Sequence, residues 1–87
     1  MWTIRIERRA EKDLAKLSPG EQTRILDYME KRVACRADPR ELGAALTGVL
    51  AGLWKYRVGH YRVLARIEDD TVTIWVVRIG HRREVYR

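Results

Sequence analysis

The chain has 87 residues, of which 46% are hydrophobic and 34% charged, and it carries a net charge of +6 at pH 7. This length suits one domain over residues 1–87, built around a single modest core, and it excludes a second domain. The hydrophobic content excludes a disordered chain, and no apolar run approaches the ~20 residues that a membrane-spanning helix requires.

The basic residues are strongly biased toward arginine, which accounts for fourteen of the 18. A guanidinium group presents a planar fork of donors that matches phosphate, so the bias favours a polyanionic partner such as RNA or DNA, or an acidic protein. A basic surface without a specific partner is the alternative.

The single cysteine and the N-terminus indicate the compartment. One cysteine excludes an internal disulfide and is typical of a protein of the reducing cytoplasm. The N-terminus has no apolar run of signal-peptide length. We therefore expect a cytoplasmic protein that does not associate with a membrane.

The spacing of apolar residues near the N-terminus predicts a strand followed by a helix. Residues 2–6 alternate apolar and polar side chains, which predicts a half-buried strand. From there Ala10, Leu14 and Leu17 lie at helical spacing, which predicts a short amphipathic helix. Asp13 then falls on the outer side of that helix, together with its charged neighbours.

A second helix is predicted to begin at Ser18. Serine is a favoured N-cap, Pro19 suits the first helical position, and Glu21 stands where a capping box needs a glutamate. Asp38 precedes a proline and is therefore expected to end the helix. The two helices, joined by a short turn, should form an antiparallel hairpin.

Three strands are predicted in the C-terminal half, after a less regular connection over residues 40–52. Residues 53–58, 61–68 and 71–79 are rich in β-branched and aromatic side chains, with two-residue turns between them. The result is an α+β fold of order β-α-α-β-β-β. Its N-terminal strand and antiparallel helix hairpin pack on one face of a small antiparallel sheet.

The turns also predict which side chains share a face. Two-residue loops pair Val58 with Tyr61, Ala65 with Ile74 and Val63 with Val76, which gives one wholly apolar face for the helices to cover. The opposite face then carries Lys55, Arg57, Arg62, Leu64, Arg66, Thr73, Trp75 and Val77.

Two cations stand directly opposite one another on this second face. Like charges paired across antiparallel strands are destabilising, and the fold gives no reason to place Arg57 opposite Arg62. Each cation alone could be an ordinary solvated strand residue. Because Arg82 and Arg83 follow the last strand, the concentration of charge favours an anion-binding surface.

One reaction needs little beyond such a surface: cleavage of RNA by attack of its own 2′-hydroxyl on the adjacent phosphate. Arg57, Arg62 and Arg82 are candidates to stabilise charge on the phosphoryl oxygens. The candidates for proton transfer are Lys55, His81 and Tyr86, and Tyr86 could instead stack on a base. The further candidates for binding RNA are Arg66, Trp75, Arg78 and Arg83.

No metal or cofactor is expected, because the histidines and the cysteine lack ligand spacing and no phosphate-binding glycine loop is present. If the surface described above cleaves RNA, we expect it to do so as a metal-independent endoribonuclease.

The C-terminal half resembles the RelE-type toxins of bacterial and archaeal toxin–antitoxin modules, within the RelE/ParE superfamily. The resemblance lies in the hairpin Trp-x-x-Arg-Val-Gly-x-Tyr-Arg-Val beginning at Trp54, in the valine-rich strand, and in Gly-His-Arg-Arg-x-x-Tyr beginning at Gly80. The Ala-x-x-x-Leu-x-x-Leu spacing from Ala10 fits as well, so the resemblance spans nearly the whole chain.

This resemblance implies an mRNA endonuclease that cuts messages in the ribosomal A site. It also implies inhibition by an acidic antitoxin that wraps the toxin in a hetero-oligomeric complex. The family's active positions fall on Lys55, Arg57, Arg62, Arg82 and Tyr86. Arg57 departs from the family pattern, where a lysine is expected, and an arginine cannot serve as a general base.

Two alternatives remain open. A ParE-like toxin shares the fold but binds DNA gyrase and traps its cleaved complex, with no catalytic set of its own. A relative that has lost activity would persist as a binding module. The arginines at positions 62 and 82, with Tyr86, favour the ribonuclease.

Overall fold

A computed structural model describes residues 1–81. The predicted site residues Arg82, Arg83 and Tyr86 lie outside the described residues. The elements are β1 (Thr3–Ile6), α1 (Arg8–Ala15), α2 (Pro19–Tyr28), a π-helical turn (Met29–Val33), a 3-10 helix (Pro39–Leu42), β2 (Ala44–Ala45), a 3-10 turn (Gly48–Leu50), β3 (Leu53–Val58), β4 (Tyr61–Glu68) and β5 (Thr73–His81).

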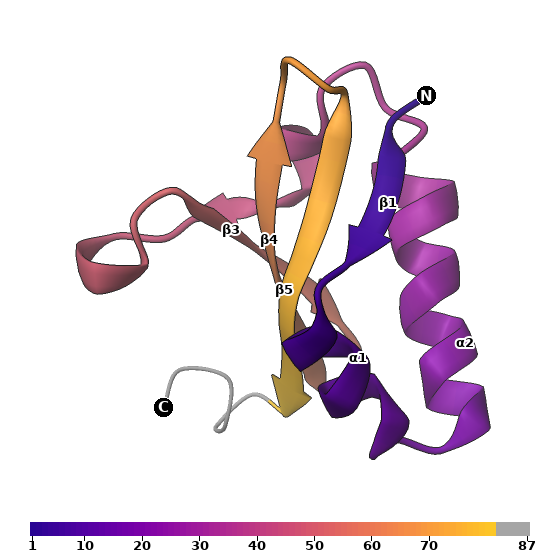
Figure 1. Cartoon of the computed structure of the whole chain (residues 1–87). Coiled ribbons are helices and arrows are strands. Elements are labelled where there is room, and N and C mark those ends of the chain that lie inside the picture. Colours follow the sequence, from indigo (N-terminus) through magenta and orange to yellow (C-terminus); the bar gives the residue numbers. More distant parts are fainter. Residues whose placement is uncertain (82–87) are drawn as a thin grey trace.

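The predicted α+β class is confirmed, with both helices lying against one sheet (Figure 1). The sheet has the order β1-β5-β4-β3-β2. It is mixed, because β1 joins β5 in parallel while the other pairs are antiparallel. The short strand β2 within residues 40–52 had no sequence signal. Among residues 1–81, no helix is long and apolar enough to cross a membrane.

The hairpin of β3 and β4 has the predicted register. Val58 pairs with Tyr61, Tyr56 with Val63, and Arg57 with Arg62. Gly59 has a φ of 61° at the first turn position, a conformation that glycine adopts without strain. A two-residue loop of this kind fixes the register locally, which is why the sequence was sufficient to predict it.

The register predicted for β4 and β5 is wrong, by two residues near the turn and by three beyond Ala65, where Val63 pairs with Ile79 instead of Val76. The turn covers residues 69–72 instead of Asp69 and Asp70 alone, so Ala65 pairs with Val76 and Ile67 with Ile74. The ladder is then irregular between Leu64 and Ala65, because Leu64 pairs with Arg78 and Val77 is left as an extra residue. Arg78 therefore stands opposite Leu64 on the face where Val77 was expected.

The start of α2 is confirmed and its predicted end is wrong. The Ser18 Oγ accepts a hydrogen bond from the Glu21 N–H at 3.3 Å, and Pro19 is the first helical residue. Regular α-helix ends at Tyr28, and the chain continues through the π-helical turn to Val33, short of Asp38. The proline thus acts on a segment that has already left the helix.

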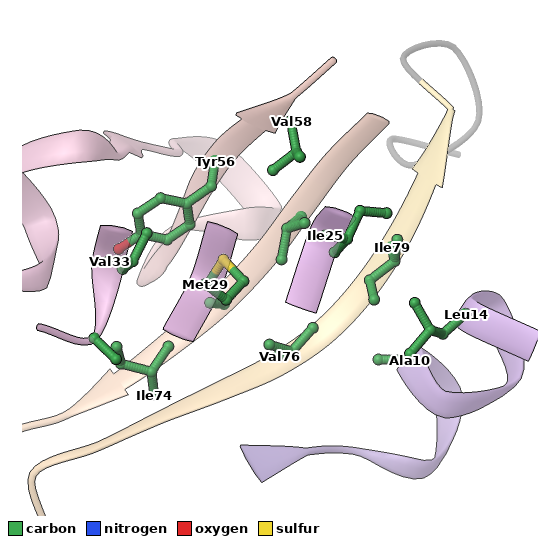
Figure 2. Packing of buried hydrophobic residues seen from close by; sticks show 13 residues of the cluster. Ala10, Leu14, Ile25, Met29, Val33, Tyr56, Val58, Ile74, Val76 and Ile79 are labelled. Carbon is green, nitrogen blue, oxygen red and sulfur yellow. The ribbon is translucent and has the colours of Figure 1, made fainter. Parts of the chain in front are cut away.

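The core lies between the helices and the sheet (Figure 2). From the helical side Ile25, Met29 and Val33 are at most 1% exposed. From the sheet Tyr56 and Ile74 are fully buried. The apolar face predicted from the strand alternation is therefore the face that packs against the helices.

The prediction that Asp13 lies on the outer side of α1 is wrong, because this residue is buried and only 9% exposed. Its Oδ2 accepts hydrogen bonds at 3.0 Å from the Arg78 Nε and from the Ile79 backbone N–H. Strand β1 pairs with β5 only as far as Val76, so beyond that point this edge of β5 has no strand partner within residues 1–81. Asp13 supplies the missing acceptor and ties α1 to that edge.

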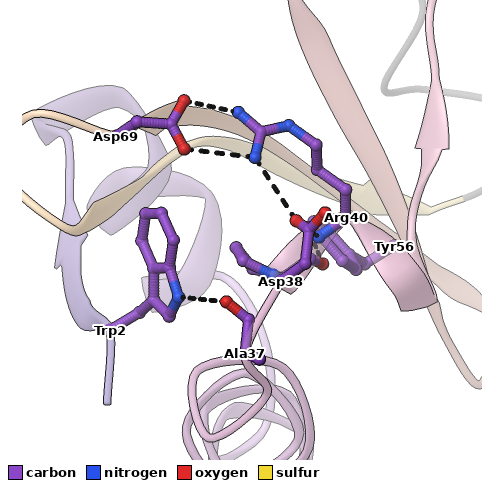
Figure 3. Close-up of polar contacts among 7 residues, drawn as sticks. Trp2, Ala37, Asp38, Arg40, Tyr56 and Asp69 are labelled. Carbon is purple, nitrogen blue, oxygen red and sulfur yellow. Dashed lines mark hydrogen bonds and ion pairs between the residues drawn. The ribbon is translucent and has the colours of Figure 1, made fainter.

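A second polar cluster joins the connection at residues 38–40 to the sheet (Figure 3). Arg40 donates to both oxygens of Asp69, at 2.7 and 3.2 Å, and to Asp38 at 3.3 Å. The hydrogen bond from Arg40 lowers the pKa of Asp69. Beneath this cluster the Tyr56 hydroxyl donates to the Pro39 carbonyl at 2.7 Å.

Tyr56→Phe is expected to lower the free energy of unfolding by about 1–3 kcal/mol, because it leaves the buried Pro39 carbonyl without its donor. Urea denaturation measures the change. Tyr28→Phe is the matched control, since that half-buried tyrosine has no hydrogen-bonded partner among residues 1–81 and should change stability little. Equal effects of the two substitutions would contradict the prediction.

Stability should also fall at high pH. Burial raises the pKa of Tyr56 to about 12. An unfolded tyrosine ionises near ~10, so between roughly pH 10 and 12 only the unfolded state loses this proton. The contribution of the protonated Tyr56 hydroxyl to the free energy of unfolding is therefore complete below about pH 10, and it disappears as the pH rises toward 12. Urea denaturation across this range should show a steeper decline for the wild-type protein than for Tyr56→Phe.

Candidate functional site

The cations of the β3–β4 hairpin lie on the face of the sheet opposite the helices. Arg57 pairs with Arg62, and Arg62 pairs on its other side with Gly80. One row further along, Lys55 pairs with Leu64. Because alternate strand residues project to opposite faces, all three cations point away from the core. We call Lys55, Arg57, Arg62 and Arg66 the basic face.

The cations of the sheet differ in how they are neutralised. The Arg66 Nη2 lies 3.5 Å from Glu7 Oε2, and Arg78 is held by Asp13. Within residues 1–81, neither Arg57 nor Arg62 has a carboxylate within ion-pairing distance. The repulsion between these two neighbours is therefore uncompensated inside the described part of the protein, and the pair is a candidate anion site.

The basic face is not uniformly solvated, contrary to expectation. Arg62 is 7% exposed, Leu64 1% and Thr73 6%, whereas Arg57 is exposed. The one side-chain hydrogen bond of Arg62 within residues 1–81 runs from Nη1 to the Tyr61 carbonyl at 3.4 Å. A guanidinium held away from water interacts more strongly with an incoming anion than an exposed one does. Arg62 is thus the least solvated cation of the basic face.

His81 is not brought to the basic face. It pairs with Tyr61, and its ring lies edge-on to the Tyr61 ring at 6.1 Å. Ile79, two residues earlier, is buried in the core, so His81 projects to the helical side of the sheet. The structure therefore separates His81 from Lys55 and Arg62. The extra residue at Val77, which the sequence did not reveal, sets this orientation.

The remaining predicted RNA-binding residues divide into two settings. Trp75 is half-buried, and the Arg66 guanidinium lies 6.0 Å from its ring centroid. Arg78 is engaged with Asp13 at the edge of β5 and is less available to a ligand. Arg5, which sequence reasoning missed, pairs with Trp75 across β1 and β5 and is exposed. Only the parallel pairing of β1 could have indicated Arg5.

Within residues 1–81, no group of three or more His, Cys, Asp or Glu side chains is placed to hold a metal ion. The fold and the uncompensated cations of the basic face describe a small α+β protein suited to an anionic partner.

Comparison with known proteins identifies the class. The family model described as "ParE toxin of type II toxin-antitoxin system, parDE" matches residues 4–86. Toxin RelG of Mycobacterium tuberculosis is 33% identical over 86 residues, which cover 99% of this chain and 97% of RelG. The chain therefore belongs to the ParE toxin family of type II toxin–antitoxin systems, within the RelE/ParE superfamily.

Solved structures agree with this assignment. A chain of the RelBE2 toxin–antitoxin complex from Mycobacterium tuberculosis matches with a TM-score of 0.84 and 31% identity, over 95% of this chain and 93% of that one. The archaeal RelE–RelB complex of Pyrococcus horikoshii matches in fold with a TM-score of 0.71 and 23% identity, over 95% and 97%. The isolated E. coli RelE toxin also matches in fold, with a TM-score of 0.72 and 21% identity, over 99% of this chain and 92% of that one.

Proposed function

We propose that this toxin is a ribosome-dependent mRNA endonuclease that cleaves by attack of the RNA's own 2′-hydroxyl on the adjacent phosphate. The observation that carries the proposal is the pair Arg57 and Arg62, placed directly opposite one another with no carboxylate partner within residues 1–81. Such a pair is unfavourable for the free protein and favourable for a phosphate bound between the two side chains.

The proposed reaction takes its nucleophile from the substrate. The bond from O2′ to phosphorus forms as the bond from phosphorus to O5′ breaks, and charge grows on the non-bridging oxygens. Arg57 and Arg62 stabilise that charge as fixed donors, and we assign Arg82 to the same task. In-line placement of the 2′-hydroxyl supplies the remaining acceleration.

Proton transfer completes the reaction: one proton leaves O2′ and another reaches O5′. An arginine side chain stays protonated in proteins and cannot accept a proton, so Arg57 and Arg62 are restricted to electrostatic roles. His81 projects to the other side of the sheet. We therefore assign proton transfer to Lys55, one row from Arg62, and to Tyr86.

We also propose that an acidic antitoxin binds this toxin in a hetero-oligomeric complex. Two of the similar structures are toxin–antitoxin complexes. The net charge of +6 and the basic face provide electrostatic complementarity to an acidic chain. An antitoxin that covers Arg57 and Arg62 would block the phosphate site directly.

The second candidate function is poisoning of DNA gyrase, and the match to the ParE family model favours it. Purified toxin added to translating ribosomes separates the two. The ribonuclease predicts cuts in the message within the A site, mapped by primer extension. Intact messages together with gyrase-dependent DNA breaks in a parallel reaction would establish the alternative instead.

A further inference from the structure

A pocket of about 380 Å³ lies between α1 and the end of β5, at the sheet edge beyond β1. Its volume falls in the ~300–1,000 Å³ range of small-ligand sites. Neither the fold nor the proposed cleavage uses it. The side chains that give it its chemistry are Arg9, Lys16, Arg78, Leu17, Tyr61 and His81.

The pocket carries a net positive charge. Its one acid, Asp13, already has both oxygens engaged: Oδ1 lies 3.7 Å from the Arg9 Nε, and Oδ2 accepts from Arg78 and from the Ile79 N–H. Lys16 is exposed and has no carboxylate partner within residues 1–81. Three cations against one satisfied carboxylate favour an anionic ligand.

One wall of the pocket is aromatic. The Tyr61 and His81 rings meet edge to face with centroids 6.1 Å apart, and the His60 ring stacks on His81 at 6.4 Å. Leu17 adds an apolar surface beside them. Aromatic faces bind nucleic-acid bases by stacking, and an arginine or lysine beside such a wall can hold the attached phosphate.

The pocket is also adjacent to the proposed cleavage site. Arg62 pairs with Gly80, and the next pair along the same two strands is Tyr61 with His81. Neighbouring residues of a strand project to opposite faces, so the two sites lie back to back at the end of the sheet. An RNA strand bound at Arg62 that passes over this end reaches the aromatic wall.

We propose that this pocket binds one nucleotide of the RNA strand, with its phosphate on Arg9 and Lys16 and its base against Tyr61 and His81. The proposal rests on the ribonuclease function, which it extends by a second RNA subsite. Because the subsite is defined by binding, it can be tested without any cleavage.

The test uses the full chain and a 5′-phosphorylated RNA trinucleotide made uncleavable by 2′-deoxy substitution. Arg9→Gln combined with Lys16→Gln is expected to weaken binding about 10- to 30-fold in calorimetric titration, because two charge-assisted contacts are lost. Arg8→Gln with Lys12→Gln is the matched control: both residues lie on the same exposed helix outside the pocket, and the change in charge is identical. That control should weaken binding less than about 3-fold.

Backbone amide shifts locate the ligand. Addition of the trinucleotide should move the amide signals of Leu17, Ile79 and Gly80, and these shifts should persist in Arg62→Ala even when cleavage is lost. Equal weakening in both double variants would overturn the proposal, as would absent shifts at those amides. Inorganic phosphate that binds as tightly as the trinucleotide would overturn the assignment of a nucleotide.

Discussion

Arg62→Ala is expected to lower the rate of ribosome-dependent mRNA cleavage by about 10²- to 10³-fold, the usual effect of removing one preorganised donor to a transition-state oxygen. Arg62 is the least solvated cation of the basic face and has no carboxylate partner within residues 1–81. Single-turnover cleavage on programmed ribosomes measures the loss. Arg62→Lys should recover only part of the rate, because an ammonium keeps the charge and loses the bidentate fork.

The stability of the same variant separates a functional role from a structural one. Removing a buried charge that faces Arg57 relieves repulsion, so the free energy of unfolding of Arg62→Ala should stay level or rise. Arg8→Ala, an exposed residue of α1, should leave both cleavage and stability unchanged. Full cleavage by Arg62→Ala would refute the assignment, and a loss of cleavage explained entirely by unfolding would refute it equally.

Asp13→Ala is expected to destabilise the protein by about 2–4 kcal/mol. The substitution removes the acceptor of the Ile79 backbone N–H and leaves the Arg78 guanidinium without its partner. Both groups lie beyond the end of β1, on the edge of β5 that faces away from β4, so no other part of the described chain replaces the carboxylate. Urea denaturation followed by circular dichroism gives the change in unfolding free energy.

Two controls define that result. Glu11→Ala removes an exposed carboxylate from the same helix and should cost no more than ~0.5–1 kcal/mol. Adding Arg78→Ala to Asp13→Ala should cost less than the sum of the two single changes, since the pair acts as a unit. If Asp13→Ala and Glu11→Ala destabilise equally, the edge of β5 does not depend on Asp13.

The parts of the fold that sequence could predict are those specified by neighbouring residues. The Gly59 turn fixes the β3–β4 register within a few positions, and Ser18 with Pro19 fixes the start of α2. Both features depend on local backbone preferences that are the same in any context. The prediction that Arg57 faces Arg62 was right for this reason.

The parts that sequence could not predict depend on distant segments. Strand β1 joins β5 across almost the whole chain, and Asp13 is buried only because β1 stops short of the end of β5. The longer turn at residues 69–72 requires a φ of 50° at Val72, which a β-branched residue rarely adopts. No local preference indicated that turn.

In the candidate site, too, the features set by neighbouring residues were predictable and those set by distant contacts were not. Lys55, Arg57 and Arg62 share one locally specified hairpin, and the structure keeps them on one face. The orientation of His81 depends on the extra residue at Val77, which is a property of the packed ladder. The sequence pattern therefore predicted correctly that the hairpin cations share one face, and it misjudged the side to which His81 projects.

That irregularity has an evolutionary consequence. Without Val77 the ladder would run unbroken, with Ala65 still opposite Val76 and Leu64 still opposite Arg78. Strand β5 thus tolerates a one-residue difference in length at this position while every other pair is kept. The half of β5 that β1 borders and the half that leads to the C-terminal arginines can vary independently. Substitutions or changes of length beyond Val77 would then leave the pairing of β5 with β1 undisturbed.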